Sequence, residues 1–295
     1  MLTSPEFYNA ILRATTPILF ATLAAGVAQQ AGICNMALEG IMLFATLFGA
    51  IFSFQFKSWV AGILLTALCG ALIGLILAFF VLNLKTDEII AAIAINLTAS
   101  GATVLLLMAY SGDRGTSSFR SIPAPTVAIS VLGPILGKQN LMTWLAIVAF
   151  IVMHLLLYKT PLGLKIRAVG ENKNAAESVG ISSRKIQYIA LIISGVLASL
   201  GGYFLSSGYM TTFTKEMAAG RGFIALAASA MGRHTPIGGS LVSLLFGFAQ
   251  AISNQLQLTG FPVELLQMIP YLITLIGLAV FSYVELRRKA KLSGK

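Results

Sequence analysis

KTPLGLKIRAVGENKNAAESVGISSRK, residues 159–185, is a long polar segment between strongly apolar ones. It contains six basic and two acidic residues, so its net charge is +4. A basic polar segment flanked by apolar ones is typical of a chain that crosses a membrane and returns. The segment therefore separates two groups of apolar segments.

Residues 168–181 within this segment predict a short helix that ends at Gly180. Either Asn172 or Asn174 can cap its start. A cap at Asn174 places Glu177 at the third helical position, as in a capping box.

On that helix Ala175, Ala176 and Val179 fall on one face at helical spacing. The face is small and smooth, and it suits a shallow groove on a partner protein. The alternative is a solvated loop with one chance turn of helix.

The composition of the whole chain sets its class. Hydrophobic residues make up 57% of the 295 residues and charged residues only 10%, and the mean hydropathy is +0.87. Soluble domains contain about 25% charged residues. The sequence predicts an all-α polytopic transmembrane bundle of about eight to ten membrane segments, folded as one domain over residues 1–295.

Eight apolar stretches are long enough to span a bilayer: residues 9–30, 36–54, 59–83, 88–110, 141–158, 186–207, 236–254 and 266–284. A ninth stretch, residues 218–232, is shorter. It opens with Gly220-Arg221-Gly222 and closes with Gly232-Arg233-His234, which favours a broken or partly re-entrant helix.

The net charge of +10 does not indicate nucleic-acid binding, because no basic face is interleaved with aromatic residues. The basic residues instead indicate how the chain is oriented in the membrane. The basic segment 159–185 and the basic tail 285–295, each with a net charge of +4, are predicted to be cytoplasmic. Residues 111–140, a loop with room for a short surface helix, are then external. The N-terminus is external if residues 29–40 form a simple turn and cytoplasmic if they re-enter, and charge does not decide between these.

Polar side chains at membrane depth are costly, and three clusters of them occur. Such residues either make hydrogen bonds between helices or line a transport site. A carboxylate such as Glu39 can also be satisfied by the free amides of a helix N-terminus. The clusters are Gln29, Gln30, Asn35 and Glu39; Asn96, Thr98 and Ser100; and Lys215, Glu216, Gly220, Arg221 and Gly222.

Motifs of enzymes and of bound cofactors are missing from the sequence. It has no phosphate-binding loop, no metal-ligand spacing and no Ser/His/Asp set that fits one site. Cys34 and Cys69 lie in apolar segments, where buried thiols are expected. His154 also lies in an apolar run and is expected to be buried. His234 has no assigned role. The chain is therefore not expected to be an enzyme, and any ATP hydrolysis belongs to another chain.

Four motifs resemble a known family. AVGENKNAAESVGISSRKIQ, from residue 168, looks like the cytoplasmic coupling motif of permease subunits of ATP-binding cassette importers. NMALEG from residue 35, EIIAAIAINLTA from residue 88 and GRGFIALAASAMGRHTPIGG from residue 220 are similar to the branched-chain-amino-acid, ribose and nucleoside permeases, and closest to the nucleoside or simple-sugar branch. The chain departs from that branch at Met36-Ala37, Asp87 and Ser178-Val179.

The resemblance implies an importer of the bacterial inner membrane. Two permeases, often different ones, would sit in membrane lipid with ATPases that use ATP and Mg below them and a substrate-binding protein or lipoprotein above. The cargo implied is a nucleoside, with a purine nucleoside favoured and a simple sugar or riboflavin as the alternative. An ion-coupled secondary transporter is disfavoured, because Glu39 is the one plausible acidic residue inside the predicted spans.

The same resemblance suggests residue roles, which we state as expectations. The residues expected to couple to the ATPase are Gly170, Glu171, Asn172, Ala175, Ala176 and Gly180. The residues expected to line the translocation pathway are Asn35, Glu39, Asn96 and Arg221.

Overall fold

A computed structural model describes residues 5–127, 139–257, 268, 270, 272–277, 279 and 283. Seven helices among these residues are long and apolar enough to cross a membrane, which confirms the all-α polytopic bundle. They are α1 (Pro5–Gln30), α2 (Leu38–Gln55), α3 (Trp59–Leu82), α4 (Glu88–Ser111), α6 (Leu141–Lys159), α9 (Ser183–Phe204, prolonged by the π-helical turn η2, Leu205–Tyr209) and α11 (Pro236–Gln257). Of the predicted span 266–284 only some residues are described, and these are helical; the tail 285–295 lies outside the described residues.

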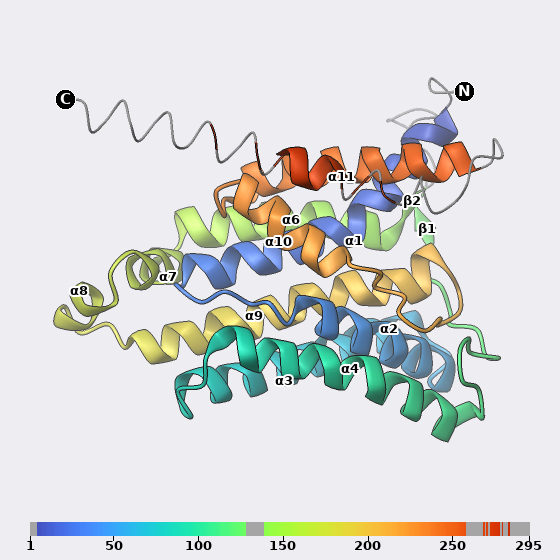
Figure 1. Ribbon diagram of the computed structural model, residues 1–295, viewed down its shortest axis with the longest axis horizontal. Helices are drawn as coiled ribbons and strands as arrows, with labels where there is room; N and C mark the ends of the chain where they lie inside the picture. Colours follow the sequence, from blue (N-terminus) through green and yellow to red (C-terminus); the bar gives the residue numbers. More distant parts are fainter. Residues whose placement is uncertain are drawn as a thin grey trace.

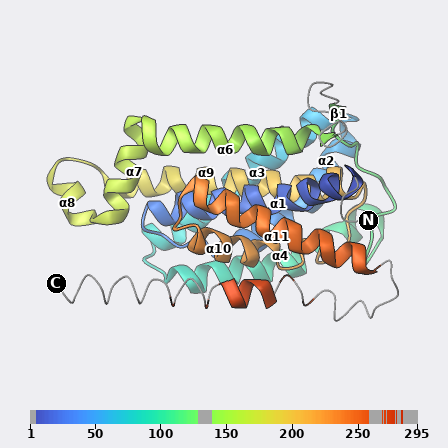
Figure 2. The same ribbon diagram turned by 90° about the horizontal axis from the view of Figure 1, so that it is seen from above.

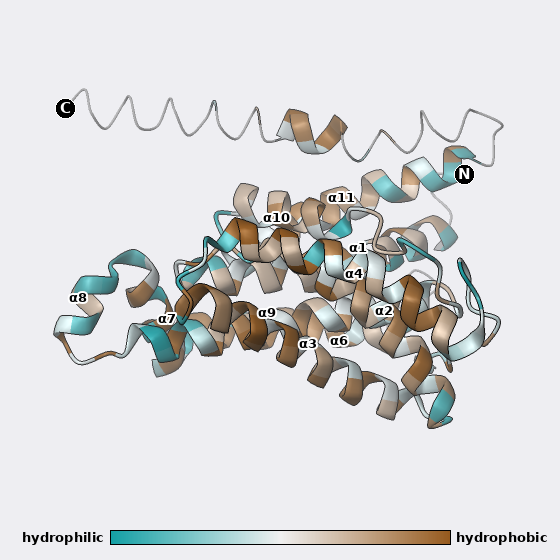
Figure 3. Ribbon diagram, turned by 60° about the horizontal axis from the view of Figure 1, so that its bottom comes forward, coloured by the Kyte–Doolittle hydropathy of each residue, from teal (hydrophilic) through white to brown (hydrophobic). Residues whose placement is uncertain are grey.

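The long helices lie roughly along one axis of the molecule, as Figures 1 and 2 show. At one end, α7 (Pro161–Glu171) and α8 (Lys173–Ser178) project from the bundle. At the other end lie the start of α1 and two short antiparallel strands, β1 (Thr126–Val127) and β2 (Gln139–Asn140). Figure 3 shows that α8 is hydrophilic while the helices of the bundle are largely apolar.

The core of the bundle is formed by α1, α2 and α9. Most of their side chains are buried, whereas α3, α4 and α6 expose many large apolar side chains, as helices beside lipid do. Close packing of α3 on α9 depends on glycines: a Cβ at Gly74 would come within 3.4 Å of the Cα of Gly195 and still closer to the Leu191 carbonyl oxygen. The small residues that the sequence places in residues 186–207 thus let two backbones touch.

Two interruptions break the helical bundle. Residues 31–37 separate α1 from α2, and residues 210–220 separate η2 from the short helix α10 (Arg221–Met231). The structure therefore confirms the predicted broken helix, and it places the break before Arg221.

The two interruptions enter the bundle from opposite ends. Segment 31–37 starts beside α7, whereas segment 210–220 starts beside the loop that follows α4, where Ser121 N donates to the Thr211 carbonyl oxygen at 2.7 Å. Both reach the middle, so the N-terminal ends of α2 and α10 meet there, as the hydrogen bonds of Glu39 show.

The start of α1 lies at the end opposite α7. Gln139 Nε2 donates to Asn9 Oδ1 at 2.6 Å, which ties α1 to β2. If the basic segment 159–185 is cytoplasmic, as its charge predicts, the start of α1 is external. Residues 112–127 form the irregular loop expected at that end, and residues 128–138 lie outside the described residues.

Candidate functional site

Segment 31–37 is held in place by side chains from distant helices. The Asn35 side chain is buried, donates to Ser194 Oγ at 2.8 Å and accepts from Ala37 N at 3.1 Å. From α4, Glu88 accepts from Cys34 N at 3.0 Å, and from α9 Gln187 donates to the Ala31 carbonyl oxygen at 3.1 Å. The bonds of Glu88 and Gln187, and that of Asn35 to Ala37 N, satisfy backbone groups at an interruption of the helices.

Asn96 connects the same segment to the middle of α4. Its Oδ1 accepts from Gly40 N at 2.8 Å, and its Nδ2 donates to the Met36 carbonyl oxygen at 3.0 Å. Gly40 permits this approach, because a Cβ there would lie 2.9 Å from the Asn96 Cα. Asn96 therefore fixes where α2 begins.

Glu39 lies between two helix N-termini. It belongs to the first turn of α2, and its two oxygens accept hydrogen bonds from the first amides of α10: Oε1 from Gly220 N at 2.8 Å and Oε2 from Gly222 N at 2.7 Å. A carboxylate is favoured at such a position because the helix dipoles and the free amides are positive there. Gly222 has to be glycine, since a Cβ would lie 2.7 Å from the Glu39 Cα.

Arg221 follows at the start of α10 but does not bond to Glu39. Its guanidinium donates to the carbonyl oxygens of Met217 and Ala218, both at 3.2 Å, and lies 5.6 Å from the centre of the Tyr209 ring. Arg13 of α1 lies 5.0 Å from the same ring and donates to the Tyr209 carbonyl oxygen. Two cations thus contact one aromatic ring in the π-helical turn η2, and such turns are frequent at functional sites.

A polar pocket of about 1000 Å³ opens beside Tyr209, at the end of the bundle opposite α7 and α8. It lies among α1, the strands, η2 and the end of α11, and its lining includes Asn9, Arg13 and Asn254. Asn254 Nδ2 donates to the Tyr209 hydroxyl at 2.9 Å. Sequence reasoning missed this pocket, because its residues come from four separate parts of the chain and form no motif.

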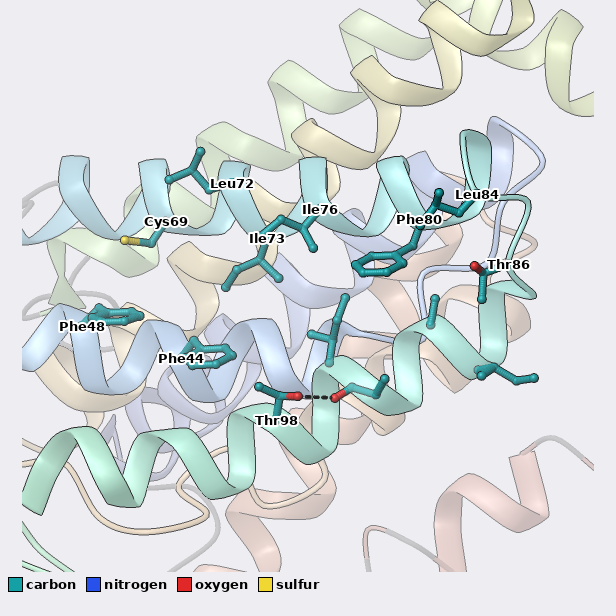
Figure 4. Close-up of a pocket in the computed structure, with 14 residues that line it drawn as sticks. Phe44, Phe48, Cys69, Leu72, Ile73, Ile76, Phe80, Leu84, Thr86 and Thr98 are labelled. Atoms are coloured by element: carbon teal, nitrogen blue, oxygen red, sulfur yellow. Dashed lines mark hydrogen bonds between the residues drawn. The ribbon is translucent and has the colours of Figure 1, made fainter.

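An apolar groove of about 670 Å³ lies between α2, α3 and α4. Figure 4 shows Phe44 and Phe48 on one wall and Cys69, Ile73 and Phe80 on the other. The Phe44 and Phe48 rings are stacked, with centroids 5.9 Å apart. The groove was not anticipated from the sequence either, since apolar residues at helical spacing are common to every span.

The basic segment 159–185 folds into α7 and α8 with a single residue, Asn172, between them. Asn172 Oδ1 accepts from Ala175 N at 3.0 Å, so Asn172 is the N-cap of α8 and Asn174 is not. Gly180, at φ +83°, ends the turn after α8 as predicted. Gly180 N donates to the Glu177 carbonyl oxygen and Ile181 N to the Ala176 carbonyl oxygen, both at 3.0 Å, which is a Schellman motif.

The predicted small face is divided in the structure. Ala175 and Val179 are exposed, with Val179 at 73% exposure, but Ala176 is buried at 4%. Ala176 therefore belongs to the core, where α8 packs on both α7 and α9. The exposed surface of α8 consists of Ala175, Val179 and the polar side chains around them.

Gly170 joins α7 directly to the end of α1. Its backbone lies against Gln30 and Gly32, and a Cβ at Gly170 would overlap the Gln30 carbonyl oxygen. A Cβ added at Gly32, whose φ angle is +78°, would lie 3.3 Å from the Gly170 Cα. No side chain separates the basic loop from the first interruption.

The remaining candidates have structural surroundings. Cys34 and Cys69 are free, half-buried thiols. His234 lies between α10 and α11, where its carbonyl oxygen accepts from Gln30 Nε2 at 2.6 Å, its ring lies 3.1 Å from Ser229 Oγ, and burial lowers its pKa. Within the described residues, no group of three or more His, Cys, Asp or Glu side chains could hold a metal ion.

Seven apolar helices, two interruptions that meet in the middle and a basic loop at one end define a multi-pass membrane permease. The chain belongs to the family described as branched-chain amino acid transport system / permease component, whose model matches residues 7–278.

Curated relatives of the chain include ABC transporter permeases. It is 33% identical to the guanosine ABC transporter permease protein NupQ of Bacillus subtilis, over 90% of this chain and 88% of the relative. It is 33% identical to the nucleoside ABC transporter permease protein NupC of Lactococcus lactis, over 90% and 89%. Identity to the putative glucose ABC transporter permease protein TsgC13 of Haloferax volcanii is 26%, over 96% and 92%. No solved structure matches the chain.

Proposed function

We propose that this chain is the transmembrane permease subunit of an ATP-binding cassette importer and forms the translocation pathway for nucleosides, with purine nucleosides as the main cargo. The observation that carries the transport mechanism is the backbone contact of Gly170 with Gln30 and Gly32. This contact links an exposed basic loop to the interruption whose far end positions Asn96 and Glu39.

In this proposal α8 docks on the ATPase. Ala175 and Val179 supply the exposed contact, Glu171 and Asn172 flank it, and Gly170 transmits its movement. Ala176 and Gly180 support docking indirectly, since the buried Ala176 holds α8 against the rest of the chain and Gly180 forms the turn that ends it. ATP and Mg are used by the partner chain.

The pathway residues of the proposal are Asn35, Glu39, Asn96 and Arg221. All four lie at the two interruptions, where transporters place substrate. Asn35, Asn96 and Glu39 bond to protein groups in this conformation, so their part is to hold the interruptions and to release or rebind them as access alternates. Arg221 contacts Tyr209 at the edge toward the polar pocket.

The cargo is argued from the relatives. Two permeases named for guanosine or nucleosides are each 33% identical to this chain over nine tenths of its length, and a third, NupB of Lactococcus lactis, is 26% identical. A simple sugar is the second candidate, favoured by the 26% identity to the TsgC13 permease. The proposed partners are ATPase subunits, a second permease and an extracytoplasmic binding protein, all at the bacterial inner membrane.

The test is uptake of radiolabelled guanosine and adenosine into proteoliposomes that contain the complete complex, with and without ATP, and with ribose and riboflavin as competitors. ATP-dependent nucleoside uptake that neither competitor blocks is the expected result. ATP-dependent uptake of ribose instead would overturn the cargo, and uptake that does not need ATP would overturn the importer.

A further inference from the structure

The irregular segment 210–220 brings a charged side chain to the middle of the membrane. Glu216 Oε1 accepts a hydrogen bond from Ser100 Oγ of α4. Ser100 lies 12 residues after Glu88 in this helix of 24 residues, which is about 18 Å along it at 1.5 Å per residue. The Glu216 carboxylate therefore lies close to the mid-depth of the bilayer.

This carboxylate is exposed on the single chain. Glu216 is exposed, Ser100 is half-buried, and Gly101 is exposed with no atom within 4 Å of the position that its Cβ would take. Lipid does not cover such a surface, because a charged side chain in hydrocarbon is costly.

The backbone gives a second, independent indication. Segment 210–220, which joins η2 to α10 in Figure 1, pairs with the loop after α4 as far as Lys215, and its remaining residues 216–220 are not helical either; Glu216 and Ala219 have positive φ angles of 55° and 47°. Non-helical backbone at membrane depth occurs where it is buried in protein or lines a water-filled cavity. This segment, with an exposed charge, fits the second case.

We infer that Ser100, Gly101 and Glu216, here named the Glu216 face, line the aqueous translocation pathway opposite the second permease, and that Glu216 binds hydroxyl groups of the cargo. The inference rests on the proposed function, since it names the part of the pathway that touches the solute. It adds Glu216 and Ser100 to the residues expected from the sequence.

The chemistry of the face restricts the cargo. An ionised carboxylate only accepts hydrogen bonds, so its ligand has to donate them. Oε1 already accepts from Ser100, and Oε2 has no hydrogen bond within the part of the chain that the structure describes. A vicinal pair of hydroxyls, as on ribose, is a common partner of a carboxylate. Both a nucleoside and a free sugar carry such a pair.

The position of the face is tested first by cysteine labelling of the assembled complex in membranes. Cys34 and Cys69 are replaced by alanine, and Gly101→Cys is compared with Ile151→Cys, an exposed position near the middle of α6. A charged, membrane-impermeant thiosulfonate is expected to label Gly101→Cys and not Ile151→Cys. Labelling of both, or of neither, would overturn the placement, and this result does not depend on which solute is carried.

The role of Glu216 is tested by the Michaelis constant for uptake. Guanosine is compared with 2′,3′-dideoxyguanosine in the parent complex, in Glu216→Gln and in Lys215→Gln, a control on the same exposed segment. Glu216→Gln is expected to raise the KM for guanosine about tenfold, because it loses a charged acceptor, and to leave the KM for the dideoxy compound unchanged. Lys215→Gln is expected to change neither value.

An equal change in KM for both compounds in Glu216→Gln would overturn the contact with the cargo hydroxyls. It would mean that Glu216 has a structural role only. A complex that imports ribose but not guanosine would overturn the nucleoside cargo alone. In that case ribose and its deoxy analogue replace the two nucleosides in the same comparison, so the two failures are distinguished.

Discussion

Single side chains at the centre of this molecule bond mainly to backbone groups of other elements. Glu39 bonds to α10, Asn96 to segment 31–37 and to α2, and Gln187 to the Ala31 carbonyl oxygen. In a membrane each such bond replaces one that water would otherwise supply. Removal of one of these side chains therefore leaves a buried donor or acceptor unpaired.

Glu39→Gln is expected to destabilise the protein. The two carboxylate oxygens each accept from one amide of α10, and a glutamine directs its NH₂ group at one of these amides. An unpaired buried donor costs about 1–3 kcal/mol, so the thermal midpoint in detergent should fall. Glu177→Gln, which changes an exposed carboxylate on α8, is the control and should leave the midpoint unaltered. An unaltered thermal midpoint in Glu39→Gln would mean that one side-chain oxygen at this position is enough to hold the start of α10.

At the level of elements, the helix pair α7 and α8 has two different sides. One side is buried against the bundle and includes Ile166, Val169 and Ala176, and the other is exposed and includes Ala175 and Val179. Substitutions on the buried side should therefore affect stability, and substitutions on the exposed side should affect binding of a partner.

Ala175→Trp and Ala176→Trp form a matched pair of variants. Ala175→Trp adds a large side chain to the exposed side, so it should leave the stability of the permease unchanged and weaken ATPase binding. Ala176→Trp has no room beside α9 and should lower the thermal midpoint, because overpacking of a buried site costs about 1–3 kcal/mol. Thermal unfolding and pull-down of the ATPase measure the two effects. Normal ATPase binding by Ala175→Trp would contradict the docking role of α8.

Gly170→Ala should uncouple the loop from the pathway. The new Cβ overlaps the Gln30 carbonyl oxygen, so α7 and segment 31–37 have to separate. We expect ATPase activity of the assembled complex to persist while uptake falls at least tenfold. Gly115→Ala, in the loop after α4 with open space around the added Cβ, is the control and should transport normally. Full uptake by Gly170→Ala would show that this contact carries no movement.

At the level of the whole molecule, the orientation in the membrane follows from the two ends of the bundle. Arg114, in the loop after α4, and Lys173, in α8, are exposed at opposite ends. In spheroplasts of a variant without Cys34 and Cys69, an impermeant maleimide should label Arg114→Cys directly. Lys173→Cys should react only after permeabilisation, and the reverse pattern would contradict the charge-based orientation.

The sequence allowed much of this fold to be predicted, because apolar length, glycines and loop charge act locally. Seven of the eight predicted spans, the break at Gly220 and the turn at Gly180 are confirmed, whereas the span 266–284 is only partly described. The partners of the polar residues could not be predicted: Glu39 bonds to Gly222, 183 residues away, and Cys34 N to Glu88, 54 residues away. The N-cap at Asn172 and the burial of Ala176 depend on how α7 and α9 pack, which helical periodicity does not encode.

The meeting of two helix N-termini at Glu39 also sets the electrical balance at the centre of the molecule. Each terminus contributes about half a positive charge, and Arg221 adds a full one. Glu39 and Glu216 supply two negative charges, and Lys215, the neighbour of Glu216, adds one more positive charge, so charges of both signs lie near the centre. An uncharged cargo of the kind proposed above needs no counter-ion to cross a centre where the protein supplies charges of both signs. The same arrangement that joins α2 to α10 therefore lowers the cost of charged groups at this depth, because groups of opposite sign lie close together.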